Sequence, residues 1–542
     1  MIKLSGIRLS EQCDVAGLQQ IAAEILGVPA WEITAFEVNK LSIDARRKSE
    51  VRFVYSLILS LKNEAAVLLK ANKKQQRPPV SISSYTPPDR YTFPALKGLA
   101  PPNPPIIVGM GPAGLFAALC LLEAGVKCII LERGQPIEQR IGSVHRFWQE
   151  GVLNEESNVQ FGEGGAGTFS DGKLTTGISD TRIRHVLSRL VEFGAPKDIL
   201  YLAKPHIGTD KLRSVVIGIR KKLITLGCDV RFGHRLADIE IMDGALRSVS
   251  VIEGERTYNI ATSSLILAPG NSSRDTFEVL DKRGIKLSPK PFSVGVRIEH
   301  KQSDIDFAQY GNKAMTSGVC FPSSDYKIAT HLDGDRSVYS FCVCPGGLVV
   351  AAASERDGLV TNGMSLYARS EENINGALLV SVTPEDFGIM PLDGVAFQRK
   401  IEQAAFVAGG SNYYAPAQLV GDFLEKRASI GPGKIMPSYL PGVKYCNLWD
   451  VLPEFVCVSL RTALLEFSKS ISGFSVHDAV MTAAETRSSS PLRILREDFQ
   501  TVGIKGIFPC GEGAGYAGGI MSAAVDGIKC AEAFAASASV FE

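Results

Sequence analysis

Four residues in the first quarter of the chain have the types and the spacing that a dinucleotide site needs. Gly109, Gly111 and Gly114 form the pattern G-x-G-x-x-G, and Glu132 follows after about 20 further residues. The first glycine permits a tight turn, the second lets the main chain approach a pyrophosphate, and the third lets a helix pack closely on a strand. The acidic residue accepts hydrogen bonds from a ribose 2′-hydroxyl, and its charge disfavours a 2′-phosphate. The pattern therefore predicts dinucleotide binding.

The elements that must position these residues are also readable. Residues 106–108 are an apolar run that predicts a strand, and residues 115–124 predict a helix that ends at Gly125. Residues 128–131 predict a second strand, which leads directly into Glu132. The N-terminus of the helix would offer unpaired N–H groups to the phosphates. Because glycine is common in this chain, at 52 of 542 residues, the flanking elements carry the prediction more than the glycines do.

A second glycine-rich segment, SNVQFGEGGAGTFSDGKLTT, occupies residues 157–176. Glycine-rich main chain can wrap closely around a ligand. The large apolar residues Phe161, Phe169 and Leu174 argue against a flexible surface loop. We interpret His206, which follows in KPHIGTD, as a structural hydrogen-bonding residue. The cofactor contacts predicted in and before this segment are Pro112, Ala113, Arg133, Arg140, Gly164, Gly165, Gly167, Thr168, Phe169 and Ser170.

Two later segments end in the same kind of glycine-rich turn. The apolar run LILAPG, residues 265–270, ends at Ala268, Pro269 and Gly270. Residues 503–533 read GIKGIFPCGEGAGYAGGIMSAAVDGIKCAEA, in which we expect a strand over 507–510 and a helix that begins near Gly518.

Taken together, these segments resemble the flavoprotein superfamily of the glutathione-reductase type, in which G-x-G-x-x-G and a distant glutamate open the FAD domain. An A-T-G-like strand end closes the middle FAD segment of that superfamily, whereas this chain has Pro269 in the central position. More closely, the chain resembles a bacterial family of uncharacterised FAD-dependent dehydrogenases. The segments that carry this resemblance are FGEGGAGTFSDGKL, FCVCPGG, SERDGLVTNGMS, ETRSSSPLRI and CGEGAGYAGGIMSAAVDG.

The resemblance implies non-covalent FAD, but it implies no substrate. In relatives the Gly-Asp/Glu pair approaches the ribityl-pyrophosphate region, and the start of the following helix faces the flavin O2. The further cofactor contacts that this implies are Ala268, Gly270, Gly511, Glu512, Gly518, Gly519, Ile520 and Met521.

The expected fold is α/β and divides into five stretches. Residues 1–74 predict a small ferredoxin-like α/β module, and residues 75–104 predict an extended linker because prolines are frequent there. A Rossmann-like, three-layer FAD domain is expected from discontinuous segments, 105–290 and 471–542, with an inserted α+β substrate domain over 291–470. Within the module, SIDARRKSE predicts a solvated hairpin loop, with an anion or RNA contact as the alternative.

Three residues are candidates for catalysis: Cys344, Arg487 and Tyr516. Cys342 and Cys344 form a C-x-C pair that we interpret as buried apolar residues, with a redox pair as the alternative. For Glu485 and Arg487, a place in the substrate pocket and a structural ion pair stay equally open. Residues 291–470 contain no second G-x-G-x-x-G pattern, so NAD(P)H, if it is the reductant, would visit an open face transiently.

Composition limits the classes of function. Hydrophobic residues make up 45% and charged residues 21% of the chain, and the net charge is +1, which is typical of a globular protein without a general attraction to nucleic acid or anionic membranes. We expect no membrane partner, no signal peptide and no metal site. The 11 scattered cysteines favour a reducing cytoplasm.

The sequence therefore predicts an FAD-dependent oxidoreductase that passes a hydride through the flavin N5 to or from a small molecule. Two alternatives stay open. One is a tRNA-modifying flavoprotein whose N-terminal module binds RNA, and the other is a non-catalytic flavin-bound sensor or scaffold.

Overall fold

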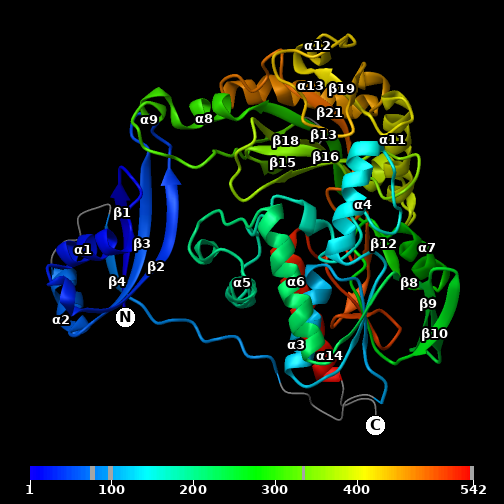
Figure 1. Cartoon of the computed structure of the whole chain (residues 1–542), viewed down its shortest axis with the longest axis horizontal. Helices are drawn as coiled ribbons and strands as arrows, with labels where there is room; N and C mark the ends of the chain where they lie inside the picture. Colours follow the sequence, from blue (N-terminus) through cyan, green and yellow to red (C-terminus); the bar gives the residue numbers. More distant parts are fainter. Residues whose placement is uncertain (74–79, 95–101, 333–335, 538–542) are drawn as a thin grey trace.

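A computed structural model describes residues 1–73, 80–94, 102–332 and 336–537. Figure 1 shows a module at the N-terminus, a central layered domain and a second sheet domain that lies above it in this view. Among the described residues, no helix combines the length and the apolar character needed to cross a membrane.

The central domain is built on a parallel sheet whose strands come from distant parts of the chain. The strand order is β25-β11-β5-β6-β7, and every neighbouring pair is parallel. The bounds are β5 Ile106–Val108, β6 Ile129–Glu132, β7 Asp229–Phe232, β11 Leu265–Leu267 and β25 Ile507–Pro509. Strands β5, β11 and β25 are short apolar runs because both faces of the sheet are covered, whereas the edge strand β7 is partly exposed and carries Asp229 and Arg231.

Helices cover one face of this sheet and an antiparallel meander covers the other, so the domain has three layers. The helices include α3 (Pro112–Glu123), α6 (Thr209–Thr225) and α14 (Ile520–Ser537), and α3 and α14 lie side by side in Figure 1. The meander consists of β8 (His234–Met242), β9 (Ala245–Glu253) and β10 (Arg256–Ala261).

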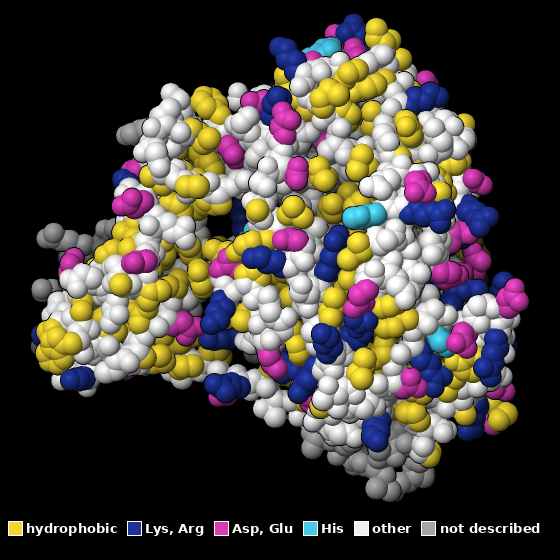
Figure 2. All heavy atoms as spheres, viewed as in Figure 1, with side chains coloured by type: hydrophobic (Ala, Val, Ile, Leu, Met, Phe, Trp, Pro, Cys, Tyr) yellow, Lys and Arg dark blue, Asp and Glu magenta, His cyan; other side chains and the backbone are white. Residues whose placement is uncertain are grey.

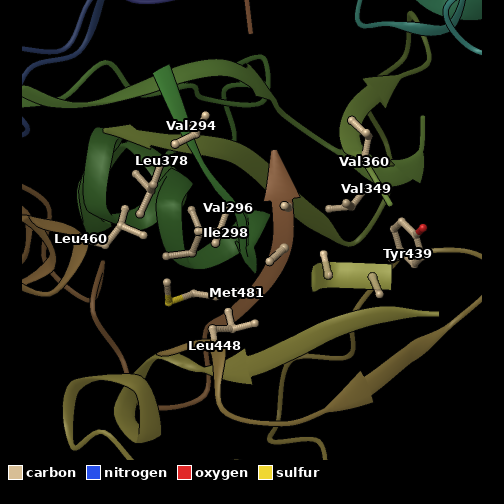
Figure 3. Packing of buried hydrophobic residues seen from close by; sticks show 14 of the residues in the cluster. Val294, Val296, Ile298, Val349, Val360, Leu378, Tyr439, Leu448, Leu460 and Met481 are labelled. Atoms are coloured by element: carbon tan, nitrogen blue, oxygen red, sulfur yellow. The ribbon is translucent and has the colours of Figure 1, made fainter. Parts of the chain in front are cut away.

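The inserted domain is organised around a seven-stranded sheet of order β14-β15-β18-β13-β21-β19-β20. The bounds are β13 Phe292–Lys301, β14 Ala329–His331, β15 Ser337–Cys344, β18 Asn373–Val382, β19 Ala415–Leu419, β20 Val443–Tyr445 and β21 Val480–Glu485. Strand β21 lies between β13 and β19 in the centre of the sheet, so the predicted end of the insert at residue 470 is too early. Figure 3 shows Leu460 of α13 (Glu454–Ser470) packed near Leu378 and Met481 in the core of this domain.

The N-terminal module has the ferredoxin-like order of elements that the sequence predicts. Strands β1 (Ile2–Leu9), β2 (Ile33–Asp44), β3 (Arg52–Leu61) and β4 (Ser81–Ser84) form an antiparallel sheet of order β2-β3-β1-β4, with helices α1 (Val15–Leu26) and α2 (Glu64–Lys73). Strand β4 pairs with β1, although it lies in the stretch predicted to be a linker. The module therefore extends to Ser84, and its boundary at residue 74 is corrected.

The module and the residues that follow it contact the rest of the chain. Leu41 donates its N–H to the Tyr201 carbonyl at 2.8 Å and accepts from the Ala203 N–H at 2.8 Å. Phe53 stacks on Phe321 with ring centroids 5.2 Å apart. Past β4, the Tyr91 hydroxyl donates to Glu532 of α14 at 2.6 Å, so this part of the predicted tether is docked on the central domain.

The remaining helices and strands are α4 (Ile137–Glu150), α5 (Arg182–Glu192), α7 (Arg274–Lys282), β12 (Leu287–Pro289), α8 (Gln302–Tyr310), α9 (Asn312–Met315), β16 (Gly347–Ala351), β17 (Thr361–Ser365), α10 (Pro384–Phe387), α11 (Asp393–Gly409), α12 (Val420–Leu424), β22 (Leu492–Ile494), β23 (Arg496–Glu497) and β24 (Gln500–Thr501).

Candidate functional site

The three glycines of the first motif have different roles in the structure. A Cβ atom on Gly109 would lie 2.2 Å from the Ala268 carbonyl oxygen, and one on Gly114 would lie 2.0 Å from the Gly109 carbonyl oxygen. A Cβ on Gly111 would meet only the Cα of Gly165, at 3.9 Å. Gly109 and Gly114 therefore allow the main chain to pack, whereas Gly111 faces open space at the start of α3.

The second glycine-rich segment lies across this turn. The Gly164 N–H donates to the Met110 carbonyl at 2.9 Å, and a Cβ on Gly165 would lie 3.0 Å from the Gly111 Cα. A Cβ on Gly167 would lie 3.2 Å from the Ile520 side chain at the start of α14. The first, second and last glycine-rich segments thus meet at the carboxyl edge of the parallel sheet.

The ends of β11 and β25 complete the same edge. A Cβ on Gly513 would lie 2.5 Å from the Gly270 carbonyl oxygen, which brings the two strand ends together. Gly270, Gly518 and Gly519 have no atom within 4 Å of a Cβ position, so bare main chain borders open space there. Met521, one residue into α14, is instead buried in the core of the central domain. The sequence predicts Met521 as a cofactor contact, and because its side chain packs in this core, such a contact would come from its main chain.

This edge fits a dinucleotide. Open main chain at Gly111, Gly270, Gly518 and Gly519 forms a cradle that side chains would fill. Two helices, α3 and α14, begin at the edge and direct unpaired N–H groups and a partial positive charge toward it. We call this cradle the glycine groove.

Glu132 holds the groove together. Its buried carboxylate accepts N–H groups from Met110 at 2.8 Å and from Gly134 and Gly162 at 2.9 Å each. A carboxylate has about four acceptor positions, so one further hydrogen bond can be accommodated. The ribose contact stays a prediction, and the structure adds a role in ordering the loops.

Four residues predicted as cofactor contacts have side chains that are engaged within the protein. Arg140 is fully buried and donates to the carbonyls of Asn158, Val159 and Glu163. Arg133 pairs with Glu156 and Asp275, while Thr168 and Phe169 are fully buried. The side chains of Arg140, Thr168 and Phe169 therefore support the second segment from within, because a side chain without exposed surface has no access to a ligand in the groove. Arg133 is partly exposed.

The inserted domain contains a buried ion pair that is connected to the second glycine-rich segment. Arg297, fully buried on β13, pairs with Glu485 at 2.6 Å and donates to the Cys342 carbonyl at 2.8 Å. Burial would lower the pKa of Arg297, but the Glu485 charge raises it above its ordinary value. Lys173, from the second glycine-rich segment, donates to the Val343 carbonyl. These two cations fix a bulge between Phe341 and Cys344 in β15.

The two cysteines of this bulge differ. Cys342 is exposed and has a φ of 41°, which is uncommon for a residue other than glycine. Cys344 is buried, and its Sγ donates to the Cys342 carbonyl at 3.3 Å. Burial raises the pKa of the Cys344 thiol to about 11. Cys344 is therefore a protonated, enclosed thiol, which argues against the catalytic role predicted for it.

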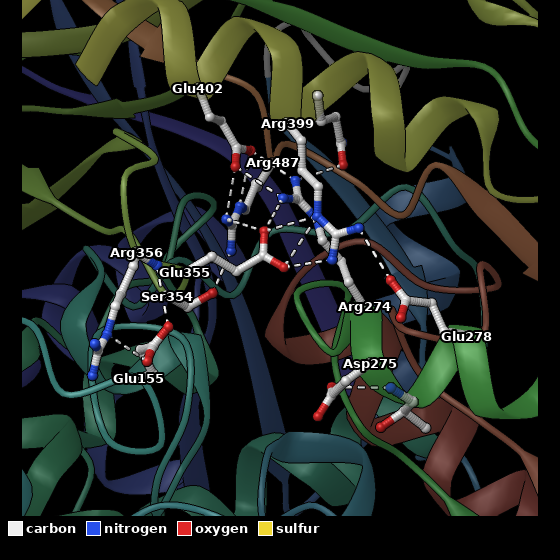
Figure 4. Close-up of polar contacts among 12 residues, drawn as sticks. Glu155, Arg274, Asp275, Glu278, Ser354, Glu355, Arg356, Arg399, Glu402 and Arg487 are labelled. Atoms are coloured by element: carbon white, nitrogen blue, oxygen red, sulfur yellow. Dashed lines mark hydrogen bonds and ion pairs between the residues drawn. The ribbon is translucent and has the colours of Figure 1, made fainter. Parts of the chain in front are cut away.

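Arg487 is also directed away from the groove. It pairs with Glu402 at 2.9 Å and also donates to Ser354, as Figure 4 shows. The pair of Glu485 and Arg487 that the sequence left open does not form, because Glu485 pairs with Arg297. Tyr516, the third catalytic candidate, packs its ring under the guanidinium of Arg496, 3.7 Å from the ring centroid.

Several residues of this site were not predicted: Lys173, Arg297, Glu402 and Asn271, whose side-chain amide donates to the Glu512 carboxylate at 2.9 Å. Lys173 lies within the quoted segment SDGKL, where its charge among glycines was a usable signal. The other three are single polar residues in otherwise ordinary surroundings, and only the tertiary structure shows their partners.

The N-terminal module was the candidate for RNA binding. Residues 45–50 do form a loop between β2 and β3, and Arg46 within it pairs with Asp44 at 2.7 Å. In Figure 2, cationic and anionic side chains are interspersed over the face that is shown. RNA binding through this module stays a prediction.

Comparisons with known proteins agree with the interpretation of the glycine groove as a dinucleotide site. The family model "FAD binding domain" matches residues 104–141, and the model "FAD-dependent protein, C-terminal domain-like" matches residues 291–488. A domain of unknown function matches residues 1–60. An uncharacterized protein from Clostridium beijerinckii is 44% identical over 539 residues, which cover 98% of each chain. The chain belongs to this family of FAD-dependent proteins. FAD is its cofactor. The open main chain and the two helix N-termini of the glycine groove fit this dinucleotide.

Solved structures of flavoenzymes are more distant. The flavin-dependent brominase Bmp2 is 12% identical over 79% of each chain, with a TM-score of 0.33. Glycine oxidase from Bacillus cereus is 11% identical over 79% of this chain and 94% of its own, with a TM-score of 0.31.

Proposed function

We propose that this protein is an oxidoreductase in which a hydride passes between N5 of FAD and a small-molecule substrate. The observation that carries the proposal is the bulge of β15, which Lys173 ties to the glycine-rich segment and the buried Arg297 ties to β13 of the inserted sheet. When bound, FAD supplies the two-electron chemistry, and the protein supplies position and electrostatics. We place the substrate between the groove and the bulge of β15, where Cys342 is exposed.

The chain's own residues would fix the walls of this space. The Asp171 carboxylate forms an ion pair with Arg369 at 2.6 Å and accepts a hydrogen bond from the Ser365 hydroxyl. The glycine-rich segment is therefore tied to β17 of the insert. The Trp148 indole N–H donates to the Ala351 carbonyl at 2.9 Å, which ties α4 to β16. With both walls anchored, a substrate would meet a preformed site, which lowers the cost of ordering on binding.

We also propose that the protein is a dehydrogenase and that it belongs to the flavoproteins of the glutathione-reductase type. The insert carries no dinucleotide motif, so we propose that NADH or NADPH acts as a transient reductant at an open face of the site.

Anaerobic reduction tests the proposal. The purified holoprotein is titrated with NADH and with NADPH while the flavin absorbance is followed, and the reduced protein is then mixed with a panel of organic oxidants. We expect bleaching by one of the nucleotides and rapid recovery with at least one oxidant. Retained FAD that neither nucleotide reduces and no oxidant turns over would overturn the proposal in favour of the sensor or scaffold alternative.

RNA binding has a separate test. Affinity for tRNA that falls steeply as salt rises would support the tRNA-modifying alternative, because phosphate contacts are salt-dependent.

A further inference from the structure

Asn271 joins three segments that are far apart in the sequence. It follows the end of β11, and its side-chain amide donates to the Glu512 carboxylate at 2.9 Å and to the Arg487 carbonyl at 3.1 Å. An amide NH2 group has two donors, so both are used. One side chain thus connects the middle FAD segment, the end of the inserted domain and the last FAD segment.

Each partner of Asn271 is held at its other end. Glu512 also lies close enough to the main chain of Gly519, at the start of α14 and beside the open main chain of the groove, for Gly519 to lower the pKa of its carboxyl. Arg487 is clamped by Glu402, which is fully buried and also binds Arg274 at 2.7 Å. Figure 4 shows that Arg274 and Arg487, which come from different elements, converge on Glu402.

We propose that Asn271 is a positioning residue, which holds the Glu512 carboxylate at the start of α14 and couples it to the ion cluster around Glu402 in the inserted domain. The path runs from Glu402 through Arg487 and Asn271 to Glu512 and the groove. It makes FAD affinity depend on how the inserted domain is seated. This inference rests on FAD binding in the groove and not on the reaction proposed above.

The charge state of Glu512 makes this path measurable, because it should appear as a step in the pH dependence of FAD affinity. Burial raises the pKa of Glu512 to about 7, whereas Lys290, Gly519 and Asn271 each lower it. The charged groups that face this region are Lys290 and, beyond it, Arg493. Because the Asn271 amide stabilises the charged carboxylate, its loss raises the pKa of Glu512 further.

The first experiment measures the dissociation constant of FAD across pH 5.5–8.5 in full-length protein. We expect Asn271→Ala to weaken FAD binding about fivefold to thirtyfold at high pH and to move the pH step in affinity upward. Glu512→Gln should abolish that step, and adding Asn271→Ala to it should produce no new one. An unchanged dissociation constant, or a pH step that persists in Glu512→Gln, overturns the proposal.

The inserted domain offers a matched control. The Asn373 amide has the same pattern, since it donates to the buried Glu299 carboxylate at 3.0 Å and to the Met436 carbonyl at 2.8 Å. Asn373→Ala should lower thermal stability but leave FAD affinity within about twofold. An equal loss of FAD affinity in both variants would show that Asn271 acts only through general stability.

A double-mutant cycle tests the coupling to the ion cluster. We expect Glu402→Gln to weaken FAD binding about threefold or more alone, and by much less when Asn271 is already alanine. Arg487→Lys replaces Glu402→Gln if the latter fails to fold. Glu278→Gln, which removes a partner of Arg399 at the outer edge of the cluster, is the control and should be neutral. If the fold-changes in FAD affinity of the two single variants multiply in the double variant, the two residues act independently and the proposed path is wrong. If the double-mutant cycle shows the expected coupling but the protein does not turn over, only the proposed reaction is contradicted.

Discussion

The enclosed thiol of Cys344 allows a test at the level of single residues. With a pKa of about 11, the thiol is protonated at neutral pH, and the thiolate is the reactive form. We expect the double substitution of Cys342 and Cys344 by serine to leave the rates of flavin reduction and reoxidation within about threefold. Rapid-mixing absorbance measures both rates. A much larger loss, with FAD content and folding intact, would restore the dithiol alternative.

Glu132 carries a second residue-level prediction. Its carboxylate accepts three main-chain N–H groups around the groove, so Glu132→Gln removes a charge and one acceptor at once. Hydrogen bonds to charged groups contribute about 1.5–3 kcal/mol, which corresponds to a loss of FAD affinity of roughly tenfold to a hundredfold. Melting temperature should fall as well. Glu240→Gln, on the distant strand β8, is the control. Equal FAD affinity in wild type and Glu132→Gln would contradict the assignment.

At the level of elements, the glycines of the first turn should separate folding from cofactor binding. A Cβ on Gly114 clashes with main chain at 2.0 Å, whereas one on Gly111 enters open space. We therefore expect Gly114→Ala to destabilise the protein, and Gly111→Val to fold normally but lose FAD. Thermal melting and the ratio of flavin to protein absorbance distinguish the two. Full FAD content in Gly111→Val would show that the pyrophosphate does not approach this turn.

The start of α14 gives a second prediction for an element. Its N-terminus carries about half a positive charge, and the Ser522 hydroxyl accepts the Gly518 N–H at 3.1 Å. Ser522→Asp should oppose negative charge on the reduced flavin by roughly 0.3–1 kcal/mol, which lowers the midpoint potential by roughly 6–20 mV. Ser522→Ala, which removes the hydroxyl without adding charge, is the control for the lost hydrogen bond. Sulfite adds to the flavin N5 and leaves negative charge at N1, so Ser522→Asp should weaken its binding as well. A higher potential, or tighter binding of sulfite, would show that α14 does not face the flavin.

The elements around the groove could be predicted because their signals are local. Strand, glycine turn, helix and acid lie within 30 residues, and the helix expected over 115–124 is α3, which begins three residues earlier at Pro112. The partners of single polar residues could not be predicted in this way. Arg297 and Glu485 are 188 residues apart, and Arg274 meets Glu402 only because two domains pack together.

For the whole molecule, the sequence predicts the kind of domains better than their edges. Strand β21 belongs to the inserted sheet, although the residues after it return to the central domain. Strand β4 completes the N-terminal sheet from a stretch whose prolines indicated a tether. In both cases a strand is defined by its neighbour in the sheet, and its own residues carry no sign of which neighbour it will have.

The ion cluster around Glu402 should make the stability of the whole molecule sensitive to acid. Burial alone would raise the pKa of Glu402, but the charges of Arg274 and Arg487 hold it below its ordinary value. A carboxyl whose pKa is lower in the folded than in the unfolded protein stabilises the fold above its unfolded pKa of about 4.3, and this contribution is lost as the pH falls.

We therefore expect the free energy of unfolding of the wild type to decrease between about pH 5 and pH 3, in part through Glu402. Glu402→Gln should cost roughly 3–5 kcal/mol at pH 7, because two buried arginines lose their shared partner. The variant should also show a shallower decline in acid, since its neutral amide has no proton to take up. Denaturant unfolding at several pH values measures both effects. Parallel pH profiles for the two proteins would mean that the ionisation of Glu402 does not contribute to the acid sensitivity of the fold.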